Sequence, residues 1–114
     1  MSDSPLTTHV LDTALGKPAA GMRIVLERAG DGGYEQIAVG VTNEDGRVTD
    51  FIPADEFVAG RYLIHFDTAD YFATTKRETF YPEVAVLFNV KDPSQHHHVP
   101  LLVSPFGYST YRGS

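Results

Sequence analysis

The sequence contains no cysteine, and this absence removes several kinds of chemistry at once. Without thiols the chain can form no disulfide framework, no thiolate nucleophile and no cysteine-based zinc site. Long apolar runs are also absent, since no stretch approaches the ~18 apolar residues of a membrane-spanning helix. Residues 1–5 have neither the basic nor the apolar segment of a secretion signal. We therefore expect a cytoplasmic protein that does not act in a membrane.

Positive charge is scarce. Nine lysines and arginines stand against 15 aspartates and glutamates, which gives a formal net charge of −6. The basic residues are scattered along the chain, whereas binding of a phosphate backbone requires clustered Lys and Arg. The composition thus argues against a nucleic-acid partner and favours a small molecule or another protein.

Several catalytic motifs are missing as well. There is no G-x-S-x-G nucleophile motif and no H-E-x-x-H metal motif. The glycine-rich segment at residues 30–33 lacks the Lys-Ser/Thr ending and the following helix of a phosphate-binding loop, so it is interpreted as a hairpin turn. Without a covalent nucleophile, a hydrolytic enzyme of this sequence would use direct attack by water.

The pattern that is present is a series of short β-type runs separated by turn residues, which is typical of an all-β sandwich or barrel. With 114 residues the chain is expected to form a single domain, residues 1–114. Residues 70–77 lack alternation and begin with Asp70, a suitable helix N-cap, so they are predicted to form one short helix. We expect eight strands, at residues 6–12, 22–28, 34–42, 47–51, 61–67, 83–90, 97–104 and 107–112.

The strand at residues 97–104 is apolar on both faces. Val99, Leu101 and Val103 suit a core, but the alternate positions are His98, Pro100 and Leu102, which do not form an ordinary solvent-facing surface. An apolar outer face usually marks an interface, and the pattern therefore predicts a homo-oligomer.

Histidines are the candidates for chemistry. In the run His96-His97-His98, alternation along a strand directs His96 and His98 to one face and His97 to the other. One interpretation adds His9 to make the three imidazoles of a zinc site. Another leaves His96 as a solvated loop residue and pairs His98 with His9, which gives a base and an acid near neutral pH. The second is favoured because no carboxylate-bearing metal motif accompanies the histidines.

The last four residues, Tyr-Arg-Gly-Ser at 111–114, follow directly on the apolar and aromatic stretch at 99–108. Terminal residues are usually poorly ordered unless something holds them. An aromatic ring and an arginine at this place predict a segment that is anchored and contributes to a site. Arg47, which follows the turn residues Asp45 and Gly46, looks by itself like an ordinary surface arginine.

Three segments together resemble the transthyretin-related 5-hydroxyisourate hydrolases: residues 6–13 (LTTHVLDT), residues 45–47 (DGR), and residues 98–102 (HVPLL) continuing to the terminal YRGS. The terminal tetrapeptide is the most specific of these motifs, because it separates the enzymes from the hormone-carrying transthyretins. The resemblance implies an eight-stranded, two-sheet transthyretin-like sandwich with one short helix, assembled as a homotetramer with sites in channels between subunits.

The resemblance also implies a reaction and the residues that perform it. The reaction is the hydrolytic ring opening of 5-hydroxyisourate, a purine-derived substrate, in urate breakdown, without a metal or an organic cofactor. The implied catalytic residues are His9, Arg47, His98 and Ser114, and Tyr111, Arg112 and Gly113 are expected to bind the substrate. Two alternatives stand beside it: a transthyretin-type carrier without catalysis, and a structural or adhesion sandwich of immunoglobulin type.

The family often has tyrosine at the position of His97. Because residue 97 is expected to face away from His98, this difference should affect local packing more than catalysis.

Overall fold

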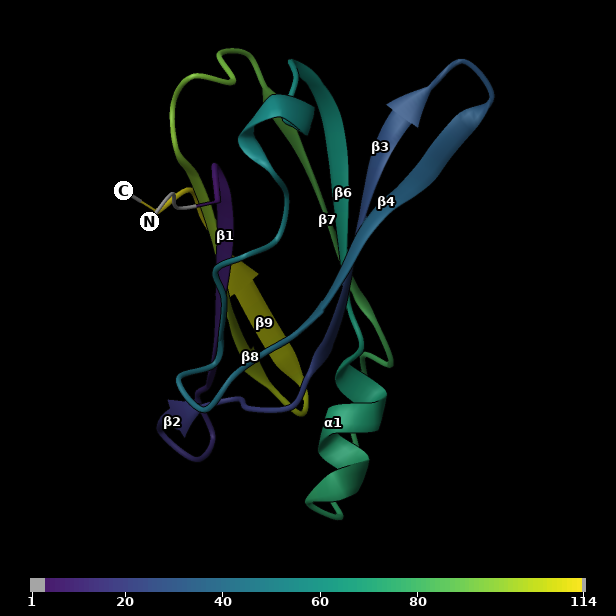
Figure 1. Cartoon of the computed structure of the whole chain (residues 1–114). Helices are drawn as coiled ribbons and strands as arrows, with labels where there is room; N and C mark the ends of the chain where they lie inside the picture. Colours follow the sequence, from purple (N-terminus) through teal and green to yellow (C-terminus); the bar gives the residue numbers. More distant parts are fainter. Residues whose placement is uncertain (1–3, 114) are drawn as a thin grey trace.

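Two β-sheets pack against each other, and one α-helix lies at an end of the second sheet (Figure 1). This is a computed structural model, and it describes residues 4–113 of the chain. The helical elements are η1 (Ala54–Glu56) and α1 (Thr68–Thr74). The strands are β1 (Leu6–Asp12), β2 (Lys17–Pro18), β3 (Arg23–Gly30), β4 (Gly33–Val41), β5 (Arg47–Val48), β6 (Gly60–Phe66), β7 (Val84–Val90), β8 (His97–Ser104) and β9 (Gly107–Thr110).

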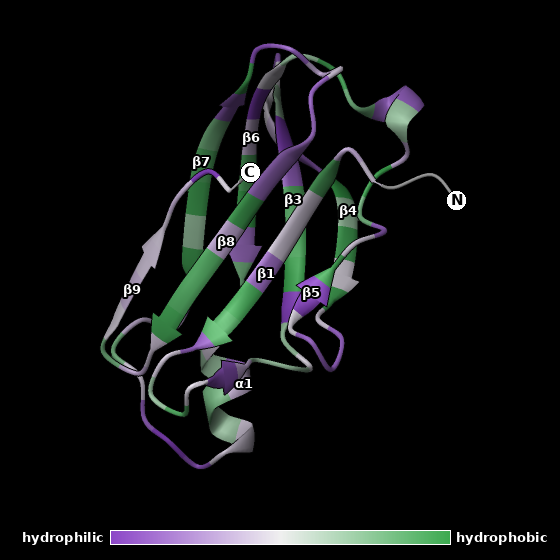
Figure 2. Cartoon of the chain, turned by 90° about the vertical axis from the view of Figure 1, so that its left-hand side faces the viewer, coloured by the Kyte–Doolittle hydropathy of each residue, from purple (hydrophilic) through white to green (hydrophobic). Residues whose placement is uncertain are grey.

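The first sheet has the order β2-β1-β8-β9, and β5 pairs with β1 on the edge that β2 also uses. Its central strands β1 and β8 are parallel, in a register that runs from Leu6 opposite His97 to Asp12 opposite Val103. Figure 2 shows this sheet face on, with β1 and β8 side by side and pointing the same way. Strand β9 then returns antiparallel along β8.

The second sheet has the order β4-β3-β6-β7, and each neighbouring pair in it is antiparallel. The β3–β4 hairpin closes where Gly30 pairs with Gly33, as the glycine-rich segment predicts. Gly33 has φ 118°, a conformation that side chains with a Cβ rarely adopt. The two-sheet all-β architecture with one short α-helix, expected from the sequence, is therefore confirmed.

The core lies between the sheets and follows the predicted alternation. Ile24 and Leu26 of β3 are fully buried, and so is Ile64 of β6. In β8 the odd positions Val99, Leu101 and Val103 are buried, which leaves His98 and Leu102 on the opposite face of the strand. The first sheet thus has an apolar inner face and an outer face that carries both polar and apolar side chains.

Three strand predictions were wrong in detail. Lys17 and Pro18, which lie outside the eight expected strands, form the additional short strand β2 against the end of β1. The strand predicted at 47–51 ends at Val48, because Phe51 and Ile52 turn inward and are buried in the core. The last strand ends at Thr110 instead of residue 112.

The helix is shifted from its predicted position. Its N-cap is Asp67, whose carboxylate accepts a hydrogen bond from the backbone N–H of Asp70, so Asp70 lies inside the first turn. The helix therefore begins at Thr68 and ends at Thr74. Within residues 4–113 no helix is long and apolar enough to cross a bilayer.

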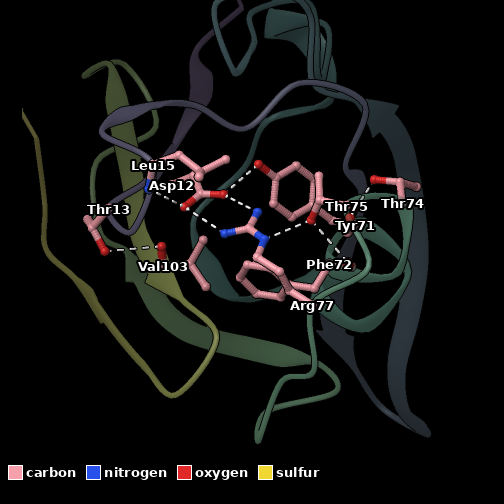
Figure 3. A network of polar contacts seen from close by, with 9 residues as sticks. All are labelled: Asp12, Thr13, Leu15, Tyr71, Phe72, Thr74, Thr75, Arg77 and Val103. Carbon is pink, nitrogen blue, oxygen red and sulfur yellow. Dashed lines mark hydrogen bonds and ion pairs between the residues drawn. The ribbon is translucent and has the colours of Figure 1, made fainter.

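A buried ionic network joins the segment after the helix to the end of β1 (Figure 3). The Asp12 side chain is fully buried, and its carboxylate accepts hydrogen bonds from the Arg77 guanidinium at 2.6 Å and the Tyr71 hydroxyl at 2.7 Å. Burial alone would raise the pKa of Asp12, but the bonds from Arg77 and Tyr71 outweigh it and lower that pKa. Burial and the neighbouring carboxylate raise the pKa of Tyr71 to about 12.

Candidate active site

Strand pairing brings three predicted site residues to one face of the first sheet. His9 on β1 lies directly opposite Arg47 on β5, and Thr7, two positions earlier on β1, lies opposite His98 on β8. Val10 and Val48, the neighbours of His9 and Arg47 along their strands, are buried in the core. The side chains of His9, Arg47 and His98 therefore project from the outer face, as expected for His9 and His98 from the sequence.

A tight turn holds Arg47 in place. The side-chain oxygen of Asn43 accepts hydrogen bonds from the backbone N–H groups of Asp45 and Arg47 at 2.9 and 3.0 Å. Gly46 has φ 74°, and its carbonyl oxygen accepts a hydrogen bond from the backbone N–H of Val10 at 2.7 Å. A Cβ on Gly46 would lie 2.4 Å from the Val10 oxygen, so only glycine allows this approach. The turn sequence thus fixes Arg47 across from His9.

His98 is held from two sides. Its Nδ1 lies 2.8 Å from the hydroxyl oxygen of Thr7. On the other side the segment after β9 returns to the hydrophilic beginning of β8 (Figure 2), and the backbone N–H of Gly113 donates to the His98 carbonyl at 2.8 Å. A Cβ on Gly113 would lie 2.5 Å from Cδ2 of the His98 ring. Gly113 is therefore packed directly against the imidazole that it was expected to accompany.

A pocket of about 980 Å³ opens beside His98 and Arg47. It contains polar groups from β1, β5 and the loop before β8, and its volume is in the range of small-molecule sites. The residues that line it are Ser4, Pro5, Thr7, Arg47, Thr49, Ala54, Pro93, Ser94, Gln95, His96 and His98.

The electrostatics around Arg47 favour neutral forms of His98, which lines the pocket, and of His9, which does not line it. Partial burial, followed by the charge of Arg47, lowers the pKa of His9. Partial burial, Arg47 and the imidazoles of His9 and His96 together lower the pKa of His98. Because a neutral imidazole accepts a proton and a charged one does not, both histidines are available as bases near neutral pH.

The predicted substrate-binding residues of the chain end lie in two places. Gly113 contacts His98, whereas Tyr111 and Arg112 line a second pocket of about 290 Å³ between β7, β8 and β9, together with His97. The Arg112 guanidinium also donates hydrogen bonds to the Gln95 side chain at 3.3 Å and the His96 carbonyl at 3.4 Å, on the rim of the first pocket. The predicted catalytic Ser114 lies outside the described residues.

The histidine run follows the predicted alternation. His96 is exposed and its ring is roughly parallel to that of His98, with 6.4 Å between the ring centroids. His97 is buried, packs edge-on against Phe57 at 5.5 Å and lies 2.8 Å through Nδ1 from the Gln95 carbonyl. The prediction that residue 97 faces away from His98 and acts in packing is consistent with this arrangement. Within residues 4–113, no three His, Asp or Glu side chains are grouped to hold a metal ion.

Thr7 is the site residue that sequence reasoning missed. Its hydroxyl contacts His98 and, at 3.1 Å, Nε2 of His96. The only signal in the sequence was its position two residues before His9, which places both side chains on the same face of a strand. Which strand would lie beside it, and therefore which histidine it would meet, depends on the sheet order.

Comparisons with known proteins agree with the fold and the motifs. The sequence profile of the HIUase/Transthyretin family matches residues 6–113. A 5-hydroxyisourate hydrolase from Salmonella typhimurium is 45% identical over 109 residues, which cover 96% of this chain and 80% of the relative.

Two solved structures are similar over nearly their whole length. The 5-hydroxyisourate hydrolase of Klebsiella pneumoniae has a TM-score of 0.84 and 39% sequence identity, and the match covers 99% of this chain and 100% of that one. Sea bream transthyretin, solved in complex with thyroxine, has a TM-score of 0.92 and 33% identity, with 96% and 95% coverage. Backbone similarity is thus high to an enzyme and to a carrier.

Proposed function

Because the chain belongs to the HIUase/Transthyretin family, we propose that it is a cyclic amide hydrolase that opens the six-membered ring of 5-hydroxyisourate. The product is 2-oxo-4-hydroxy-4-carboxy-5-ureidoimidazoline, and the step belongs to urate breakdown. The observation that carries the proposal is the convergence of His98, His9 and Arg47 on one outer sheet face, with Gly113 packed on the His98 ring.

The ring opening needs a base, and the two histidines supply one. An imidazole takes a proton from a water molecule, the resulting hydroxide adds to the ring carbonyl carbon, and the carbon–nitrogen bond breaks. The protonated imidazole returns the proton to the departing ring nitrogen. A positioned general base contributes about 10²–10⁴-fold in rate. The lowered pKa values of His98 and His9 keep both groups in the form that this first step requires.

Arg47 has two effects in this scheme. Its charge stabilises the oxyanion that forms when water adds to the carbonyl, and such fixed donors are most effective where water is excluded. The same charge disfavours protonation of the neighbouring histidines before the reaction starts.

The chain end and the assembly complete the proposal. Tyr111, Arg112 and Gly113 bind the polar ring of the substrate, and Ser114 joins the catalytic group. The enzyme is a homotetramer in the cytoplasm, with each site in a channel between subunits. The half-buried outer face of β8, which bears Leu102, supports such an association, because it would pack against a second subunit.

A second candidate is a carrier that binds a small aromatic ligand without chemistry. It is favoured by the similarity to the thyroxine complex of sea bream transthyretin, whose TM-score exceeds that of the Klebsiella hydrolase. Fold similarity does not separate the two functions. The polar side chains favour the hydrolase. Two proton-accepting histidines beside Arg47 are what hydrolysis needs, whereas an aromatic ligand can be bound without them.

The test is to generate 5-hydroxyisourate from urate in situ and to follow its decay with and without the protein. We expect decay well above the spontaneous rate, and the same rate after dialysis of the protein against a strong chelator. Decay at the spontaneous rate, together with saturable binding of thyroxine, would favour the carrier. Loss of activity after chelation would indicate a catalytic metal.

A further inference from the structure

The hydroxyl of Thr7 lies between two imidazoles. Its oxygen is 2.8 Å from Nδ1 of His98 and 3.1 Å from Nε2 of His96. A hydroxyl carries one proton and two lone pairs, so it can accept from one ring while it donates to the other. His98 is half-buried in the pocket, whereas His96 is exposed. The three groups therefore form a continuous hydrogen-bonded path from a half-buried imidazole to a solvent-exposed one.

We propose that Thr7 and His96 are a proton relay for His98, which moves the proton taken from the attacking water from the half-buried His98 to the exposed His96. The relay rests on the proposed hydrolysis for its purpose, and on the contacts among Thr7, His96 and His98 for its structure. It assigns a proton-transfer role to Thr7 and a proton-accepting role to His96.

Each step of the transfer moves one proton, and no group gains or loses a proton that is not accounted for. At the start His98 carries its proton on Nδ1 and donates it to Thr7, and the Thr7 hydroxyl donates to Nε2 of His96. When Nε2 of His98 takes a proton from water, its Nδ1 proton passes to the Thr7 oxygen and the Thr7 proton passes to His96. His98 ends neutral with the proton on Nε2, Thr7 is again a hydroxyl, and His96 is an imidazolium that exchanges with solvent. The same path in reverse resupplies a proton for the leaving nitrogen.

The surroundings of His98 explain why a relay is useful. A positive charge on His98 is disfavoured first by partial burial, then by Arg47 from β5, and further by the imidazoles of His9 and His96. His96 is exposed, and the Arg112 guanidinium donates a hydrogen bond to its backbone carbonyl at 3.4 Å. A charge moved to His96 is therefore better solvated than one on His98.

Removal of the Thr7 hydroxyl is the direct test. Thr7→Val keeps the shape and the β-branch of the side chain but breaks the path, and we expect kcat to fall by roughly tenfold, below the about 10²–10⁴-fold that a general base itself contributes. Thr7→Ser keeps a hydroxyl and should retain most activity. The matched control is Thr13→Val, which removes a hydroxyl that bonds the Val103 carbonyl, away from the histidines, and should leave kcat unchanged.

The acceptor end is tested separately. His96→Gln leaves a side chain that can bond Thr7 but cannot carry a proton, so kcat should fall and should be restored in part by added imidazole buffer. The control His65→Gln changes a histidine on the second sheet and should neither lower kcat nor create a dependence on buffer. If His96 only positioned His98, the His96→Gln variant would lose activity and added imidazole would not restore it.

A measurement without substrate separates this proposal from the hydrolysis itself. Nitrogen-15 NMR of the labelled histidines reports which ring nitrogen carries the proton, and Thr7→Val should change the Nδ1 and Nε2 signals of His98 while Thr7→Ser should not. Normal kcat in Thr7→Val, unchanged His98 signals, or a His96→Gln variant that imidazole does not rescue would overturn the relay. If the wild-type protein shows no hydrolysis, the proposed function fails, and altered His98 signals in Thr7→Val would still establish the hydrogen bond from which the relay is inferred.

Discussion

Gly113 and His98 are in direct contact through both backbone and ring. The N–H of Gly113 donates to the His98 carbonyl at 2.8 Å, and a Cβ on Gly113 would lie 2.5 Å from Cδ2 of the imidazole. The ring of a proposed catalytic base therefore rests against a position that accepts no side chain.

The first prediction follows from this contact. In Gly113→Ala the added methyl group must displace either the chain end or the His98 ring, so activity should fall by more than tenfold, since misplacement of a catalytic group by about 1 Å can cost 10²-fold. The fold should remain, as checked by circular dichroism. The control Gly32→Ala places a methyl group in open space in the β3–β4 turn and should keep full activity. Normal turnover in Gly113→Ala would mean that the position of His98 is not critical.

The second prediction concerns the two histidines. His98→Ala and His9→Ala should each lower kcat by roughly 10²-fold or more, because each removes an imidazole that moves or orients a proton. Both side chains project from the outer face of the first sheet, so the unfolding midpoint in urea should change little. A variant that keeps wild-type turnover would exclude its histidine from the mechanism.

The third prediction is a pH dependence. The pKa values of His9 and His98 lie below the ordinary 6.5, so both bases stay neutral, and kcat/KM should hold, as the pH falls past that value. The decline should begin only at lower pH. Arg47→Met removes one cause of the lowering while burial remains, so the acidic limb should move toward higher pH. Arg61→Met, an exposed arginine on β6, should leave the limb where it is.

The same shifts predict the effect of pH on stability. The folded pKa values of His9 and His98 lie below the unfolded ones. Between these two sets of pKa values, the unfolded chain therefore binds more protons than the folded protein. The contribution of His9 and His98 to stability is complete above about pH 6.5 and is lost as the pH falls through the folded pKa values. Urea unfolding of the wild type at a series of pH values measures the slope, which should be smaller in His98→Ala.

The fourth prediction concerns the Asp12–Arg77 pair. Arg77→Met leaves the fully buried Asp12 carboxylate without its cation, and loss of one partner of a buried pair costs about 3–5 kcal/mol, reduced here because Arg77 is partly exposed. Tyr71→Phe removes one hydrogen bond and should cost about 1–3 kcal/mol. Arg61→Met is the matched control and should change the free energy of unfolding by less than about 0.5 kcal/mol. Equal stability of Arg77→Met and Arg61→Met would contradict this assignment.

The fifth prediction separates structure from function at the chain end. Truncation after Thr110 should abolish most activity in protein that still folds, because it removes Gly113 from the His98 ring and Arg112 from Gln95 and His96. Hydrolysis is measured per folded protein, with folding checked by circular dichroism and assembly by size-exclusion chromatography. If the segment were only a sheet edge, a folded and assembled truncation would retain near-normal activity.

Much of the fold could be predicted from alternation along the strands. The buried positions of β3, β6 and β8 are periodic, and the same periodicity directed His98 away from Val99 and toward the outer face. Arg47 has no local feature that distinguishes it from a surface arginine. It was predicted as a site residue only because residues 45–47 resemble a motif of the family.

What could not be predicted depends on contacts between distant segments. The Asp12–Arg77 pair joins residues 65 positions apart, and the Thr7–His98 bond joins residues 91 positions apart. The first depends on how the segment after α1 packs against the end of β1, and the second on which strand lies beside β1, and periodicity encodes neither. The length of β5 was also missed, because the inward turn of Phe51 and Ile52 is set by space in the core.

The parallel pairing of β1 with β8 has a consequence for biosynthesis. Antiparallel hairpins such as β3–β4 join neighbouring segments and can form as soon as both strands leave the ribosome, but β1 has no β8 to pair with until about residue 104 has emerged. Closing so long a loop makes non-local pairing slow. During translation at about 5–20 residues per second, β1 therefore stays unpaired with β8 for several seconds. The proposed catalytic surface, which needs both β1 and β8, is therefore completed late in synthesis.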